Sequence, residues 1–230
     1  MDDFAIDPPT RPVASVRGGG VFPIRRIFCI GKNYADHVKE MGYAGKAADP
    51  VYFTKPADAI VASGTAIAYP LASDNVHFEG ELVVALKSGG MHLSEDGASS
   101  CIFGYAAGCD LTRRDHQARS KEFGSPWDAA KGFDNSAPLG EICPINDCGD
   151  INAASLKTTV NAKVRQDAQL SQMIWTVPKI IAGLSTLFEL APGDLIFTGT
   201  PEGVGPLIPG DKISVEINGL STLNFSIAVD

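Results

Sequence analysis

The stretch HFEGELVVAL at residues 77–86 joins a run typical of a buried β-strand to two acidic side chains. Side chains two residues apart in a strand point to the same face, so Glu79 and Glu81 should project together, about 7 Å apart along the backbone. A divalent cation relieves the repulsion between neighbouring carboxylates, and such oxygen ligands favour Mg²⁺ or Mn²⁺, with Ca²⁺ as a further candidate. A strand whose acidic face meets water is the alternative, although Gly80 between the glutamates weakens it.

Apolar periodicity predicts an α+β chain in which strands dominate. The expected strands lie at residues 27–30, 51–53, 66–69, 79–86, 102–109, 195–198, 212–217 and 222–229. A third carboxylate, Asp110, ends the apolar segment 102–109, where an acid is poorly suited to a core role. Thr112 and Asp115 resemble a capping box for a helix over residues 113–123. The dipeptide Asn218-Gly219 predicts a tight turn between the last two strands.

Further helices are expected at residues 33–41 and from Thr176 onward, where Pro178 stands in the first turn. Residues 1–22 are rich in Pro and Gly, so we expect an N-terminal arm without regular structure. Residues 23–230 should then form a single catalytic domain, because a chain of this length suits one large domain.

Residues 31–40, GKNYADHVKE, contain a histidine and a glutamate with helical spacing. We expect a helix that is capped by Asn33 and stops at Gly42. His37 and Glu40 then share a face and can form a hydrogen bond. A carboxylate that holds one imidazole nitrogen leaves the other nitrogen able to accept a proton from water near neutral pH. A surface histidine beside a helical glutamate is the competing interpretation.

Two further segments carry unusual residues. Lys131 stands among small and apolar residues in WDAAKGFDNS at 127–136, which fits a catalytic cation or a partly buried stem with its charged end at the surface. The glycine-rich FTGTPEGVGP at 197–206 lacks the ending of a phosphate-binding loop and the spacing of a dinucleotide fingerprint. We expect this loop to offer backbone N–H groups and a threonine hydroxyl to a carboxylate. No Gly-x-Ser-x-Gly segment is present, which argues against a serine hydrolase.

Composition excludes several classes of partner. The formal net charge of −8 argues against a nucleic-acid surface, because phosphate binding relies on clustered Lys and Arg. The five cysteines form no Cys-x-x-Cys pair, so we expect buried free thiols. The start, MDDFAIDPPTRPVASV, lacks the features of a secretory signal, and no apolar run approaches the length of about 18 residues that a membrane span needs. We therefore expect a cytoplasmic protein.

Six segments, in this order, resemble the fumarylacetoacetate hydrolase family in its short acylpyruvase and fumarylpyruvate hydrolase branch: GKNYADHVKEMG, FTKPADAI, HFEGELVVAL, GYAAGCDLTRRDHQ, PWDAAKGFDNSAPLG and FTGTPEGVGPL. The resemblance covers residues 24–228. It implies a mixed β-roll or barrel-like sandwich of the family's C-terminal-domain type, with a few flanking helices, assembled as a homodimer.

The resemblance also implies roles for individual residues. It implies a divalent metal held by Glu79, Glu81 and Asp110. His37 and Glu40, on a mobile lid helix, would activate water, and Lys131 would stabilise oxyanion or enolate charge. The positions that match the family's substrate pocket are Lys32, Tyr34, Lys55, Arg114, Gln117 and Thr200. Relatives commonly carry Arg in place of Lys32, and Lys lacks the planar fork with which Arg binds a carboxylate.

The implied reaction is hydrolysis of a carbon–carbon bond in an acylpyruvate, with fumarylpyruvate, which yields fumarate and pyruvate, as the first candidate. Oxaloacetate decarboxylation, or dienoate isomerisation or decarboxylation, on the same site is the alternative. Those reactions need no attack by water, so the pair of His37 and Glu40 favours hydrolysis. A non-catalytic β-rich binding module with a structural cation is an alternative from another class. The expected partner is a small dicarboxylic or oxo-acid substrate, with neither nucleic acid nor membrane involved.

Overall fold

The structure is a computed structural model that describes residues 5–41 and 49–229. Among these residues, the largest element is a mixed sheet of eight strands. Its main path runs in the order β4 (Val51–Lys55), β3 (Arg26–Gly31), β15 (Asp194–Phe197), β8 (Gly80–Leu86), β9 (Ile102–Cys109), β11 (Ala137–Leu139) and β5 (Ile60–Ala62), and β12 (Cys143–Pro144) pairs with β9. The sheet is mixed because β15 runs parallel to β3 and antiparallel to β8.

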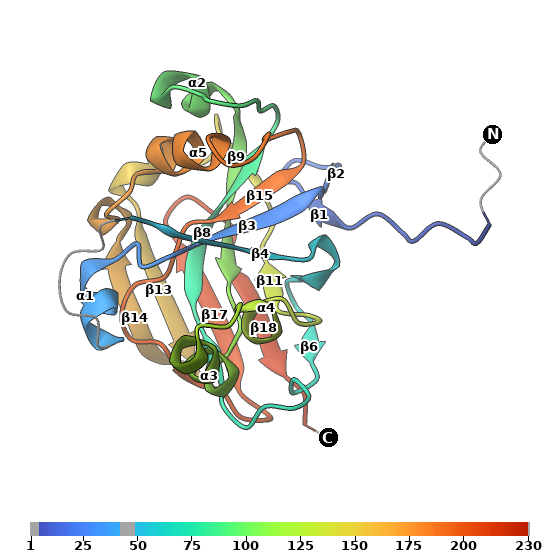
Figure 1. Ribbon diagram of the computed structural model, residues 1–230, viewed down its shortest axis with the longest axis vertical. Helices are drawn as coiled ribbons and strands as arrows, with labels where there is room; N and C mark the ends of the chain where they lie inside the picture. Colours follow the sequence, from blue (N-terminus) through green and yellow to red (C-terminus); the bar gives the residue numbers. More distant parts are fainter. Residues whose placement is uncertain (1–4, 42–48, 230) are drawn as a thin grey trace.

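A second sheet packs against the middle of the first and completes a half-barrel (Figure 1). Its order is β14 (Lys163–Gln169), β13 (Ser155–Val160), β17 (Lys212–Ile217), β18 (Leu223–Ile227) and β6 (Ala66–Ile67). Strands β13 and β17 both contact β8 of the first sheet. The expected α+β fold with a mixed, barrel-like sheet arrangement is therefore confirmed.

Strand β8 is buried along its whole length, which explains why its sequence is apolar without alternation. Leu82 and Val84 belong to the core between the two sheets, together with Leu156 of β13. Val83 and Ala85 face the other way and belong to a second apolar cluster. The strand that carries Glu81 is thus packed from both sides.

A small sheet of β10 (Thr112–Arg113), β7 (Val76–Phe78) and β16 (Gly205–Pro206) lies beside the half-barrel. The helices surround the sheets (Figure 1) and are α1 (Ala35–Glu40), α2 (Glu95–Ser100), α3 (Arg114–Phe123), α4 (Asp128–Lys131) and α5 (Val177–Ser185). Short 3₁₀ turns are η1 (Ala57–Ala59), η2 (Ile151–Ala153) and η3 (Leu170–Gln172). Within the described ranges, no helix is long and apolar enough to cross a membrane.

Two predicted helix caps are wrong. Asn33 does not cap α1, whose N-cap is Tyr34, because the Asn33 amide is buried and donates to the carbonyls of Trp175 and Thr198. Thr112 does not open α3 either, since the N-cap is Arg113 and no side chain caps it. The predicted stop of α1 at Gly42 lies outside the described residues.

Six of the eight predicted strands differ from the observed strands by one or two residues at an end. The strand expected at 66–69 ends at Ile67 as β6. The strand expected at 79–86 begins at Gly80, and Glu79 stands in a one-residue break between β7 and β8.

Part of the predicted N-terminal arm has regular structure. Strands β1 (Val13–Ser15) and β2 (Val21–Pro23) pair antiparallel, and residues 18–20 between them are glycines with positive φ angles. The hairpin buries Ala14 and Phe22 in the second apolar cluster. The expectation of an irregular lead-in is therefore wrong for residues 13–22, because the glycines make a turn between two paired strands. The boundary between an arm and the catalytic domain stays a prediction.

Candidate metal centre and active site

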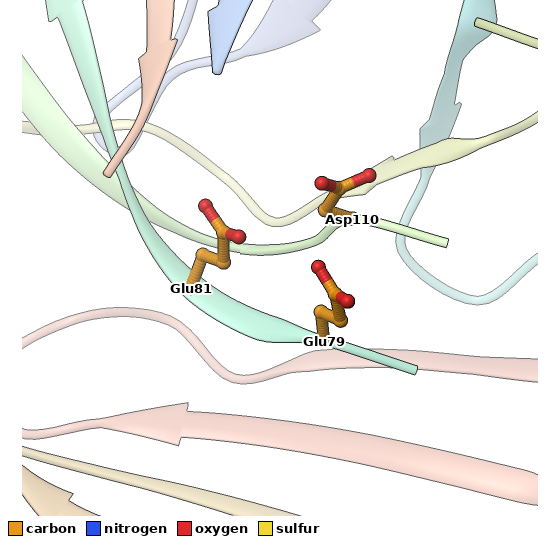
Figure 2. A group of neighbouring side chains, drawn as sticks. All are labelled: Glu79, Glu81 and Asp110. Carbon is orange, nitrogen blue, oxygen red and sulfur yellow. The ribbon is translucent and has the colours of Figure 1, made fainter. Parts of the chain in front are cut away.

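Three carboxylates converge where β7, β8 and β9 meet. Glu79 lies between β7 and β8, Glu81 is the second residue of β8, and Asp110 directly follows β9. Strands β8 and β9 pair with Gly80 opposite Cys109, and the Asp110 N–H donates a 2.8 Å hydrogen bond to the Glu79 carbonyl. The register therefore brings Asp110 beside Glu79. Figure 2 shows the three side chains directed toward one another, and one oxygen of each lies within 4.8 Å of the others.

Gly80, between the two glutamates, allows a neighbouring strand to approach. A Cβ atom added there would lie 2.1 Å from Thr158 Oγ1 on β13. The Gly80 N–H donates to Gln166 Oε1 at 3.0 Å, and the Gly80 carbonyl accepts from the Thr200 hydroxyl at 2.8 Å. Gln166 also donates to Thr200 Oγ1 at 2.8 Å. This closed network fixes the backbone between the two acidic side chains.

Three cations surround two of the three carboxylates. Lys131 Nζ lies 2.7 Å from Glu79 Oε2 and 2.7 Å from Asp110 Oδ2. Arg114 contacts the other oxygen of Glu79, and Lys55 Nζ lies 2.7 Å from Asp110 Oδ1. Both lysine ammonium groups are buried, so these ion pairs are screened little by water.

The cations keep Glu79 ionised. Burial by itself raises the pKa of this carboxyl, but the Lys131 ammonium and the Arg114 guanidinium outweigh burial and hold the pKa well below its usual range. For Lys131, burial acts to lower the pKa, and the Asp110 and Glu79 carboxylates outweigh it, so the pKa is raised. The buried pair of Glu79 and Lys131 is therefore charged on both sides.

Glu81 has a different environment. Its Oε2 accepts a 2.8 Å hydrogen bond from the Gly199 N–H, but no cation of the described residues lies within ion-pair distance, in contrast to its two acidic neighbours. Burial, and then the negative charges of Asp110 and Glu79, raise the pKa of Glu81 well above its usual range. A buried carboxylate without a cation is costly.

The donor set fits a hard divalent cation. It consists of three buried carboxylates with converging oxygens, and one of them, Glu81, lacks a counter-charge among residues 5–41 and 49–229. Oxygen-only donors of this kind are suited to Mg²⁺ or Mn²⁺. The expectation of a divalent-metal site at these residues agrees with this geometry.

The predicted pair of His37 and Glu40 forms on α1. His37 Nδ1 lies 3.1 Å from Glu40 Oε2, and the Gly203 N–H donates to the same carboxylate at 3.0 Å from Oε1. Glu40 thus links helix α1 to the glycine-rich loop. His37 is only 8% exposed and lines the same cavity as the three carboxylates.

The cavity brings most of the predicted site residues together. Its lining includes these predicted residues: Lys32, His37, Glu79, Glu81, Asp110, Arg114, Gln117, Lys131 and Thr200. Glu40, Tyr34 and Lys55 are not among the described lining residues. Tyr34 is buried where α1 begins, and Lys55 lies behind Asp110, where its ammonium also donates to the carbonyl of Leu111 at 3.1 Å.

The glycine-rich loop binds carboxylates of the protein itself. The Gly199 N–H donates a hydrogen bond to Glu81, and the Gly203 N–H donates one to Glu40. The Thr200 hydroxyl donates to the Gly80 carbonyl. Gly199 has φ of +98°, a left-handed conformation that favours glycine. The loop therefore matches the predicted chemistry, but the carboxylates it holds belong to the metal centre and to α1.

Sequence reasoning missed several residues of the site. Lys121, Phe53 and Trp127 also line the cavity. The helical spacing of Lys121 from Arg114 and Gln117 could have identified it, because positions i, i+3 and i+7 share one face. Gln166 had no local signal, since it joins Gly80 across 86 positions of the chain.

Comparison with known proteins shows which family the chain resembles. The chain matches the family described as fumarylacetoacetate (FAA) hydrolase C-terminal over residues 26–228. It is 42% identical over 176 residues to fumarylpyruvate hydrolase of Ralstonia sp, covering 76% of this chain and 91% of that protein. It is 39% identical over 201 residues to the oxaloacetate tautomerase YcgM of Escherichia coli, covering 87% and 91%.

Among solved structures, a fumarylpyruvate hydrolase from Pseudomonas aeruginosa in complex with Mn²⁺ and pyruvate is similar with a TM-score of 0.96. The two are 40% identical, and the match covers 99% of this chain and 100% of that one. The resemblance inferred from the six segments is confirmed: the chain belongs to the fumarylacetoacetate hydrolase family.

Proposed function

We propose that this protein is a divalent-metal-dependent hydrolase that cleaves a carbon–carbon bond in an acylpyruvate, with fumarylpyruvate as the preferred substrate. The observation that carries the proposal is one cavity lined by the three buried carboxylates and by His37, whose Nδ1 is held by Glu40. The Ralstonia relative and the Pseudomonas aeruginosa structure, the latter with Mn²⁺ and pyruvate, support the same reaction class.

Glu79, Glu81 and Asp110 would hold the metal. When bound, a divalent metal polarises carbonyl oxygens of the substrate as a Lewis acid. Arg114 contacts Glu79 and donates to Gln117 Oε1 at 2.6 Å. It would hold Glu79, a proposed metal ligand, in a fixed position relative to Gln117 in the cavity wall.

His37 would accept the proton of the attacking water. Its Nδ1 is held by Glu40, which leaves Nε2 to act as the base. The hydroxide adds to the carbonyl carbon of the acyl group, and the bond from this carbon to the neighbouring CH₂ breaks. The acyl group leaves as a carboxylic acid, and the electron pair remains on the pyruvate fragment as an enolate. That enolate takes up a proton to give pyruvate.

Lys131 would stabilise the negative charge that develops on the enolate. Its ammonium is buried at the cavity, and its charged state is favoured by the two neighbouring carboxylates. A fixed cation in a site that excludes water stabilises developing charge more strongly than one in solvent.

Tautomerisation of oxaloacetate is the second candidate, because a relative of this activity is 39% identical over most of its length. Tautomerisation moves a proton and needs no attacking water. The decarboxylase and isomerase alternatives also need no attacking water. The pair of His37 and Glu40 beside the carboxylates therefore favours hydrolysis. A binding module with a structural cation would turn over none of these substrates.

A substrate panel tests the proposal. The protein is stripped with a chelator, reloaded with Mn²⁺ or Mg²⁺, and offered fumarylpyruvate, acetylpyruvate and oxaloacetate. We expect loss of diketo-acid absorbance with release of pyruvate, fastest with fumarylpyruvate, and no turnover in the stripped protein. Turnover of oxaloacetate alone would support the second candidate, and turnover of none would support the binding module.

We also propose that the protein is cytoplasmic and that it forms a homodimer, the assembly that the family resemblance implies. Light scattering during gel filtration tests the assembly. A mass near twice 24.2 kDa supports the dimer, and a mass near 24.2 kDa contradicts it.

A further inference from the structure

Helix α3 presents one face to the cavity. Arg114, Gln117 and Lys121 all line the cavity, and they occupy positions i, i+3 and i+7 of this helix. Arg114, at the start of α3, contacts Glu79 of the metal centre. Seven residues of helix advance about 10 Å along the axis, so Lys121 lies about two turns further along α3 than Arg114.

Two aromatic rings span the distance between the metal centre and Lys121. The rings of Phe53 and Trp127 lie 5.7 Å apart, centre to centre. Lys131 Nζ lies 5.1 Å from the centre of the Phe53 ring, and Lys121 Nζ lies 5.6 Å from the centre of the Trp127 ring. The wall therefore has a cation at each end, one of them within the metal centre.

The charges in the cavity are arranged unevenly. The acidic side chains among its described lining residues are the three of the metal centre, and Lys131 and Arg114 lie against them. Lys121 is half-buried beyond that group. A cation in a partly buried position is suited to a second negative charge on the same substrate.

We propose that Lys121 binds a terminal carboxylate at the far end of the acyl group, and that a flat unsaturated chain lies along the rings of Phe53 and Trp127. The inference rests on the proposed function and names its substrate class: acylpyruvates whose acyl group is flat and ends in a carboxylate. Fumarylpyruvate has both features, whereas acetylpyruvate has a methyl group in place of the chain and its carboxylate.

A kinetic experiment compares the two substrates in Lys121→Gln. Loss of one charge-assisted hydrogen bond should raise KM for fumarylpyruvate about tenfold, while kcat/KM for acetylpyruvate stays within about twofold of the parent, since that substrate does not reach Lys121. Lys121→Arg should restore most of the affinity for fumarylpyruvate. The matched control is Arg119→Gln, which removes a cation from the exposed face of the same helix. This variant should leave kcat/KM unchanged for both substrates.

A binding experiment separates this inference from the proposed function. Two unreactive 2-oxo acids of equal length, 2-oxoheptanedioate and 2-oxoheptanoate, are titrated into the Mn²⁺-loaded protein by calorimetry. Lys121→Gln should weaken binding of the dicarboxylate about tenfold and leave the monocarboxylate unchanged. If the parent protein cleaves no acylpyruvate but Lys121→Gln weakens binding of the dicarboxylate alone, the proposed function fails and the role of Lys121 stands.

The opposite outcomes overturn the role of Lys121. If the parent protein cleaves fumarylpyruvate and Lys121→Gln affects both substrates equally or neither, the hydrolase proposal stands and Lys121 is not a specificity residue. If the parent protein neither cleaves fumarylpyruvate nor binds the dicarboxylate more tightly than the monocarboxylate, both proposals are wrong.

Discussion

The backbone N–H of Gly199 donates a 2.8 Å hydrogen bond to Glu81 Oε2. Gly199 can do so because its φ of +98° turns the chain just after β15. Glu81 is buried and, unlike Glu79 and Asp110, has no ion-pair partner among the described residues. One hydrogen bond from an uncharged group compensates little of the cost of burying a carboxylate. A bound divalent cation would supply the missing charge.

Glu81→Gln should therefore remove metal binding without weakening the metal-free fold. In the parent protein, Mn²⁺ at about 100 times its Kd should raise Tm by about 5–10 °C, because binding adds about 2.7 kcal/mol to the free energy of unfolding. The variant should show no such rise, and its metal-free Tm should not fall below that of the parent. Differential scanning calorimetry with and without Mn²⁺ measures both. An unchanged Mn²⁺ response in the variant would remove Glu81 from the metal site.

Lys131→Met should destabilise the metal-free protein. The substitution keeps an unbranched side chain but leaves two buried carboxylates with less positive charge, which costs about 3–5 kcal/mol. Mn²⁺ should restore part of this stability, because it supplies positive charge to the same oxygens. Urea unfolding of the variant with and without Mn²⁺ measures the effect. A metal-free stability equal to that of the parent would show that Lys131 does not compensate Glu79 and Asp110.

His37→Ala should separate catalysis from metal binding. Loss of a general base lowers kcat by about 10²–10⁴-fold, whereas the rise in Tm with Mn²⁺ should persist because His37 is not one of the metal-site carboxylates. Glu40→Gln should lower kcat less, since the amide can still accept from the Gly203 N–H and His37 remains. Steady-state rates on fumarylpyruvate measure both variants, and normal turnover by His37→Ala would refute its role in water activation.

The sequence predicts that the three acidic side chains lie close together, as the structure shows, because local order determines much of their placement. The alternation of side chains in a strand predicts that Glu79 and Glu81 share a face, although Glu79 stands in the break before β8, and the end of an apolar strand marks Asp110. What surrounds them depends on contacts between distant segments. Lys55 reaches Asp110 across 55 positions, and local patterns contain no information about such pairs.

The two wrong helix caps have the same physical cause. Asn33 has the chemistry of an N-cap, but its amide bonds with the backbone of Trp175 and Thr198, more than a hundred positions away. The Thr112 hydroxyl lies 2.6 Å from Lys131 Nζ inside the site. In each case a buried tertiary contact takes the side chain that the local pattern assigns to a helix end.

Gly80→Ala should destabilise the fold through its contact with Thr158. The added Cβ would lie 2.1 Å from Thr158 Oγ1, and relief of such an overlap costs about 1–3 kcal/mol. Thr158→Ala removes that oxygen, which is buried without a hydrogen bond, so this variant alone should be close to neutral. The double variant should be more stable than Gly80→Ala. A double-mutant cycle from urea unfolding tests this coupling, and additive effects would contradict it.

The role proposed for Lys121 gives a pH dependence with a defined sign. Burial, together with the positive charges of Arg114 and Lys131, lowers the pKa of Lys121 to about 8, while Glu79 opposes the shift. The ammonium is therefore charged below pH 8 and loses its proton above it. The Kd for 2-oxoheptanedioate should rise between pH 7 and pH 9, and the Kd for 2-oxoheptanoate should not.

Lys121→Arg provides the control for this pH dependence, because Arg stays charged throughout the range. Its Kd for the dicarboxylate should be flat between pH 7 and pH 9. If the variant and the parent show the same rise, the rise does not come from Lys121.

The central claim is that a metal held by Glu79, Glu81 and Asp110 and a water activated by His37 cleave the acylpyruvate bond. The most direct test is turnover of fumarylpyruvate by the Mn²⁺-loaded protein in ¹⁸O-labelled water, followed by mass spectrometry of the released acid. We predict fumarate with one labelled oxygen in its new carboxylate, and no fumarate from Glu81→Gln. Consumption of the substrate without release of labelled fumarate would contradict the account.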